Sequence, residues 1–133
     1  MAAFNKILCG GVNKMRGEIV ISVKNLKANA AAYRSRIDDK VALIGVVKAD
    51  GYNHGAGVIA KNVNEFSSFA VATADEAIAL RAFTAKPVLM LGCADKAEMR
   101  DLLREKITLC AWENSQIRDI ASVVGGTGEQ ARV

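Results

Sequence analysis

Apolar runs and amphipathic segments alternate four times between residues 41 and 124 of this 133-residue chain. The apolar runs are short and the first is rich in β-branched residues, as in strands buried on both faces of a parallel sheet. Each run is followed by a segment with apolar residues at helical spacing. The expected strands are 41–47, 69–72, 87–92 and 107–110, and the expected helices are 58–66, 73–83, 95–103 and 114–124. Four βα units with right-handed crossovers make one parallel sheet, so we expect an α/β fold.

Capping patterns indicate where these helices begin and end. A capping box, in which a Glu follows the cap by three residues, opens two of them. A Gly-Gly pair, Gly125-Gly126, is expected to stop the last helix. The capping boxes are Thr73 with Glu76 and Asp95 with Glu98.

Two further elements are expected before the repeat. Residues 18–23 form a short apolar run typical of a strand, and residues 25–37 carry apolar side chains spaced for one helical face, with Asn25 as the cap. Residues 1–17 are basic, and their longest apolar run is too short for a signal peptide or a membrane span. We expect this leader to be disordered.

Two parallel architectures fit the repeat. A chain of this length, with 51% apolar residues, can bury one core, so a single domain is expected. The units could belong to a five-stranded flavodoxin-like domain or to the first four βα units of a (βα)8 TIM-type barrel. The pattern alone does not separate them.

Charge and cysteine content exclude several classes of function. The net charge is +4, but the basic excess lies in residues 1–36, which hold seven Lys or Arg against Glu18. Aromatic residues make up 5% of the chain, and one, Tyr33, lies between the first and last of the cations in 24–36, which is too few for a nucleic-acid face, so no nucleic-acid partner is expected. Three separated cysteines (Cys9, Cys93 and Cys110) and a single histidine predict neither a disulfide framework nor a metal site. Reduced thiols suit a cytoplasmic protein.

Lys48 directly follows the first expected strand. An ammonium there is costly to desolvate unless it reaches solvent or lies at a cleft edge, where its amine can attack a carbonyl compound. A lysine that simply reaches solvent is the commoner case on spacing alone. The loop that follows holds Gly51, Gly55 and Gly57 and leads into a helix, an arrangement that suits a phosphate ligand.

Residues 46–55, V-V-K-A-D-G-Y-N-H-G, resemble the attachment motif for pyridoxal 5'-phosphate (PLP) in alanine racemases, V-V-K-A-N/D-A-Y-G-H-G. Two positions differ, Gly51 and Asn53. Asn is the best substitute for a glycine that has left-handed backbone angles. Residues 69–77 (F-A-V-A-T-A-D-E-A) and 87–92 (P-V-L-M-L-G) also resemble that family's F-A-V-A-T-x-x-E-A and P-I-L-V-L-G, so the resemblance covers residues 18–133.

The resemblance implies a barrel rather than a flavodoxin-like domain, with Lys48 at the carboxyl end of its first strand. It further implies that Lys48 is the Schiff-base lysine and the acid–base group on one face of the substrate. The Tyr52 hydroxyl would bind the PLP phosphate, and Val46 and Leu91 would line the cofactor pocket. It assigns no proton transfer to His54, which we expect to be structural.

The family pattern continues beyond Val133, where residues 129–133 resemble the start of a fifth strand. Residues 18–133 would then be the N-terminal half of the barrel, without the C-terminal β-domain whose tyrosine acts on the second substrate face across a homodimer. We therefore expect this chain alone to be inactive, and to self-associate or be poorly soluble through open edges at the Val41 and Ile107 strands.

Two alternatives stay open. One is another PLP barrel, such as an amino-acid decarboxylase or a PLP-homeostasis protein, although the Y-x-H-G that follows the lysine argues against both. The other is a non-catalytic fragment that binds no substrate. The expected partner is a small amino acid, with no membrane.

Overall fold

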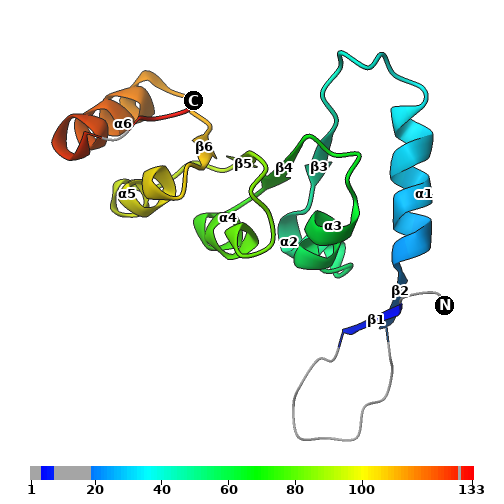
Figure 1. The fold of residues 1–133 in the computed structure, drawn as a ribbon. Helices are drawn as coiled ribbons and strands as arrows, with labels where there is room; N and C mark the ends of the chain where they lie inside the picture. Colours follow the sequence, from blue (N-terminus) through cyan, green and yellow to red (C-terminus); the bar gives the residue numbers. More distant parts are fainter. Residues whose placement is uncertain (1–3, 8–18, 129) are drawn as a thin grey trace, which may run out of the picture.

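The order of the strands decides between the two architectures. The computed structural model describes residues 4–7, 19–128 and 130–133. Its larger sheet is parallel, with the order β3-β4-β5-β6, so strands adjacent in sequence are neighbours in the sheet (Figure 1). A flavodoxin-like sheet reverses its order part-way, whereas barrel strands follow one another. The partial (βα)8 barrel is therefore confirmed. The strands are β3 (Ile44–Val46), β4 (Ser68–Val71), β5 (Val88–Met90) and β6 (Thr108–Leu109).

The helices that follow these strands lie along one side of the sheet (Figure 1). Both predicted capping boxes form: the Glu76 amide donates to Thr73 Oγ1 at 3.4 Å, and the Asp95 amide donates to Glu98 Oε2 at 3.1 Å. The helices are α2 (Lys48–Tyr52), α3 (Ala56–Asn62), α4 (Ala74–Arg81), α5 (Lys96–Arg104) and α6 (Asn114–Thr127).

Alternate strand residues face two different environments. Phe69 and Val88 are in register, fully buried, and pack in the core between sheet and helices. On β3, Gly45 lies so close to the Phe66 ring that a Cβ would approach it to 2.8 Å. Ile44 and Val46, on the opposite face of β3, are 45% and 48% exposed. That opposite face lines the interior when such a sheet closes into a barrel.

Several helix boundaries differ from the prediction: α2 was not expected, α3 spans Ala56–Asn62 where 58–66 was expected, and the cap of α1 (Val23–Arg34) and the end of α6 also differ. Helix α1 is capped by Ser22, whose Oγ accepts from the Asn25 amide at 3.3 Å, so Asn25 lies inside the first turn. Helix α6 continues through Gly125-Gly126 and ends at Thr127, followed by Gly128 at φ 72°. A left-handed residue is the stronger stop signal, because glycine within a helix only lowers its stability.

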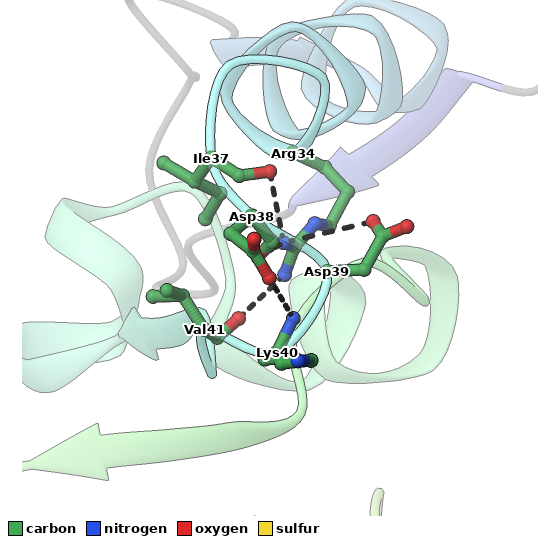
Figure 2. A network of polar contacts seen from close by, with 6 residues as sticks. All are labelled: Arg34, Ile37, Asp38, Asp39, Lys40 and Val41. Carbon is green, nitrogen blue, oxygen red and sulfur yellow. Dashed lines mark hydrogen bonds and ion pairs between the residues drawn. The ribbon is translucent and has the colours of Figure 1, made fainter.

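Strand β3 begins at Ile44 rather than Val41 because a side chain holds the preceding residues in a loop. The guanidinium of Arg34 donates to the carbonyl oxygens of Val41 at 2.7 Å and Ile37 at 3.3 Å, and also to that of Asp38 (Figure 2). Asp39 adds an ion pair at 3.9 Å. The Val41 carbonyl is therefore engaged by Arg34 at the end of α1.

Arg81 holds a second loop of this kind. Its guanidinium donates to the Lys86 carbonyl at 2.6 Å and the Glu105 carbonyl at 2.9 Å, which ties the end of α4 to the residues before β5 and β6. Desolvation by burial lowers the pKa of Arg81 from its ordinary value.

The far edge of the sheet is partly covered. The Leu109 amide donates to the Arg132 carbonyl at 2.9 Å, and Thr108 forms a parallel bridge with Arg132. The expected fifth strand therefore begins to pair with β6, and the expectation that the Ile107 strand is an open edge is wrong at this point. Glu129 lies outside the described residues.

The leader contains a strand where we expected disorder. Residues Phe4–Ile7 form β1, which pairs antiparallel with β2 (Ile19–Ser22) ahead of α1 (Figure 1). Residues 1–3 and 8–18, including Cys9, lie outside the described residues. None of the helices in the described ranges is long and apolar enough to cross a membrane.

Candidate active site

Strand β3 ends just before Lys48, where a loop begins. The Val47 amide donates to the Ala70 carbonyl at 2.8 Å, and the Val47 side chain is buried in the core. Lys48 follows, half-buried, as the first residue of α2. It therefore lies at the carboxyl end of β3, the end at which barrel enzymes place their chemistry. No hydrogen bond or ion pair engages its ammonium within the part of the chain that the structure describes.

The residues after Lys48 form a left-handed turn. Ala49 and Asp50 both have φ 52°, Gly51 has φ 63°, Tyr52 has φ 53° and Asn53 has φ 64°. Left-handed angles cost roughly 1–2 kcal/mol for each residue other than glycine. The expectation that Asn53 takes over a glycine-like conformation is confirmed. Such a turn persists only where its surroundings hold it.

Backbone and side-chain bonds hold the turn. Four amides donate back along the chain, those of Gly51, Asn53, His54 and Gly55; the shortest bonds are Gly51 to the Val47 carbonyl at 2.8 Å and Gly55 to the Asp50 carbonyl at 2.9 Å. The Asp50 carboxylate accepts from the Ala56 amide at 2.8 Å, at the start of α3. The loop is therefore closed on itself from both ends.

Glu76 ties this turn to the next βα unit. Its Oε1 accepts from the Ala49 amide at 2.7 Å, while Oε2 accepts from the Ala72 amide at 2.8 Å and the Thr73 amide at 3.4 Å. The capping pattern predicted Glu76 at the start of α4 but not its bond to Ala49. Ala49 and Glu76 are 27 residues apart, so a local sequence pattern could not predict this hydrogen bond.

The glycine-rich loop does not offer its amides to a phosphate. The amides of residues 49, 51 and 53–56 all donate within the protein. The Asp50 carboxylate also occupies the N-terminus of α3, where its negative charge would repel a phosphate. At these residues the structure therefore does not support the prediction that the loop suits a phosphate.

His54 belongs to the loop structure. Its Nδ1 lies 3.0 Å from the Gly51 carbonyl oxygen and 3.1 Å from that of Tyr52, so it donates to the turn. The structural role expected for His54 is thus confirmed.

The other predicted site residues lie at the same end of the sheet. Tyr52 is 59% exposed on the turn, and Val46 faces the open side of β3. Leu91 is half-buried just beyond β5, where its amide donates to the Val71 carbonyl at 2.8 Å. Leu91 and Lys48 lie at the same edge of the sheet, but β4 separates the strands that they follow. No hydrogen bond between these two residues is described.

The hollow beneath the loop lies on the other side of the sheet. It measures about 200 Å³ and is mostly apolar, with Val47 and Val71 at its sheet side and Phe83 at its helix side. Lys48 and Tyr52 do not line it. Asp50 and Glu76 contribute its charged lining. Among the described residues, no group of three or more His, Cys, Asp or Glu side chains could hold a metal.

Comparison with known proteins identifies the family. The family model described as "Alanine racemase, N-terminal domain" matches residues 21–133. The chain belongs to the alanine racemase family. Alanine racemase 2 of Caldanaerobacter subterraneus is 27% identical over 118 residues, and the alanine racemase of Clostridium kluyveri is 42% identical over 90 residues. These matches cover 86% and 65% of this chain.

Solved alanine racemases share the fold. The structure from Clostridium difficile 630 superposes with a TM-score of 0.77 at 30% identity and covers 81% of this chain. A structure of that racemase in complex with cycloserine matches equally well, with a TM-score of 0.77. The chain spans less than a third of the curated relatives that it matches, 30% of the Caldanaerobacter protein and 23% of the Clostridium kluyveri protein.

Proposed function

We propose that this chain is the lysine-bearing, N-terminal part of a PLP-dependent racemase that interconverts L- and D-alanine. The observation that supports this most directly is Lys48. It presents an amine without a partner among the described residues, at the carboxyl end of β3, in a chain of the alanine racemase family. Residues 18–133 would be the N-terminal half of the barrel.

The donors present fit PLP. Lys48 supplies the primary amine that reacts with its aldehyde, and Tyr52 supplies an exposed hydroxyl for its phosphate. Because the loop amides are already engaged, Tyr52 is the phosphate donor that this loop can give, and further donors must come from elsewhere. When bound, PLP supplies an electron sink that stabilises negative charge on the substrate α-carbon.

In this proposal, the chain works on one face of the substrate. Lys48 takes or returns the α-proton there, and Val46 and Leu91 exclude water from the edge that the cofactor faces. Racemisation needs an acid–base group on each face, so a second group, contributed by a partner subunit of a homodimer, completes the reaction. We further propose that the protein acts in the cytoplasm and supplies D-alanine for peptidoglycan.

The test is to find which lysine reacts with PLP. The purified chain is mixed with PLP and reduced with borohydride, and its peptides are mapped by mass spectrometry. We expect the label on Lys48, its loss in Lys48→Ala, and its retention in Lys61→Ala, a control whose ammonium lies 4.8 Å from the Phe83 ring centre. A label on Lys61 or Lys86 with Lys48 unmodified would refute the assignment.

A further inference from the structure

Among the helix-capping side chains described, Glu76 is the one that accepts a hydrogen bond from a backbone amide of the preceding βα unit. At the start of α5, Glu98 accepts from the amide of its own cap, Asp95, and at the start of α6 Gln116 accepts from Trp112 and Glu113. Glu98 stays within its own loop, whereas Gln116 also donates from Nε2 to Cys93 Sγ, at 2.8 Å, in the loop that follows β5. Glu76 caps α4 in the same way but also crosses to the preceding βα unit, where it accepts from the Ala49 amide at 2.7 Å.

That crossing fixes the residue next to Lys48. Ala49 has left-handed backbone angles. Its amide donates a hydrogen bond to the Glu76 carboxylate on α4 and not to a neighbouring strand. Among the described contacts no other group accepts from this amide. Without Glu76 the amide would be unpaired, and the left-handed turn would lose the contact that holds its first residue.

The carboxylate suits this position better than an amide would. Its two oxygens accept from three amides, those of Ala49, Ala72 and Thr73. A glutamine has one acceptor oxygen, and its NH2 group would face N–H donors on the other side. The single oxygen of Glu76→Gln satisfies two amides at the cap, those of Ala72 and Thr73, but only one at Ala49, so we expect this variant to keep the cap and lose the bond to Ala49.

We propose that Glu76 is a positioning residue for Lys48. Through its bond to the Ala49 amide, Glu76 sets the direction in which the Lys48 side chain extends from the carboxyl end of β3. The inference rests on the proposed role of Lys48 as the lysine that holds PLP. It makes the cap of the second βα unit part of the site formed by the first.

The experiment compares Glu76→Gln with Glu98→Gln, which changes the same residue type in the other capping box without a crossing bond. Hydrogen–deuterium exchange at the Ala49 amide is read by mass spectrometry with single-residue fragmentation. We expect exchange to rise about tenfold in Glu76→Gln, the size of one lost hydrogen bond, and to stay unchanged in Glu98→Gln.

The second readout is the ratio of PLP label on Lys48 to label on Lys61 after borohydride reduction. This ratio should fall several-fold in Glu76→Gln and hold in Glu98→Gln, with similar thermal midpoints for the two variants. Glu76→Asp keeps the charge but shortens the reach, and replaces Glu76→Gln if that variant does not fold.

Unchanged Ala49 exchange, or an equal loss of Lys48 selectivity in both variants, would overturn the proposal. If the wild-type chain takes no label on Lys48, the proposed function fails. Ala49 exchange then still decides whether Glu76 holds the turn.

Discussion

At the scale of single residues, the site depends on an arrangement that is strained by itself. Four residues other than glycine, Ala49, Asp50, Tyr52 and Asn53, are left-handed directly after Lys48. At roughly 1–2 kcal/mol each, such a turn forms only because bonds around it offset the cost. Strain of this kind clusters at functional sites, where it fixes the direction of a reactive group. Here it places an amine at a strand end.

The sequence predicted part of this site. That Lys48 follows an apolar strand is a local pattern of this chain, whereas the resemblance to the alanine racemase motif placed Asn53 at a glycine position. The bond between Glu76 and Ala49 was missed because the capping box already explains Glu76. The occupied loop amides were missed because glycine content says that a backbone can bend, not where its N–H groups point.

At the scale of elements, the four parallel strands and the longer helices were predictable, β1 and α2 were not, and the ends were predicted less well. Apolar runs and the 3.6 periodicity of helices follow from burial, which the sheet and the helices packed on it share. Ends depend on single contacts instead. Val41 belongs to an apolar run, but Arg34 donates a hydrogen bond to its carbonyl oxygen, and β3 begins only at Ile44 (Figure 2).

This arginine gives a test at the same scale. We expect Arg34→Ala to lower the free energy of unfolding by roughly 1–3 kcal/mol, because it leaves the carbonyls of the loop between α1 and β3 without their charged donor. Urea unfolding followed by circular dichroism measures this. Arg36→Ala, an exposed arginine two residues on, is the control and should change stability by less than about 0.5 kcal/mol. Equal effects of the two substitutions would show that the loop does not depend on Arg34.

At the scale of the whole molecule, the parallel sheet is open within the described residues, with β3 and β6 as its outer strands. Sequential strand order and helices along one side are features of a barrel. The repeat could not by itself exclude a flavodoxin-like order, since both architectures use the same units. The inner face of β3, with Ile44 and Val46 about half exposed, is the part of the fold that lacks a covering layer here.

We expect this open face to bind a second copy of the chain. The outer edge of β3 presents unpaired backbone groups, and the side chains of Ile44 and Val46 present apolar surface beside it. Light scattering on the purified chain should therefore give a mass above that of a monomer, which is 14.2 kDa. The same sample should show no measurable conversion of L- to D-alanine with PLP, because Lys48 serves one face only. A soluble, active monomer would contradict both expectations.

The measurement that tests the central claim most directly is racemase activity in a chimera. Residues 21–133 replace the matching segment of the Clostridium difficile alanine racemase, whose structure aligns over 81% of this chain. If Lys48 is the acid–base group of one face, the chimera converts L- to D-alanine with PLP. Lys48→Ala then lowers kcat by about a thousandfold or more, while Lys61→Ala leaves it unchanged. A folded chimera that is inactive, or one that stays active after Lys48→Ala, would contradict the account.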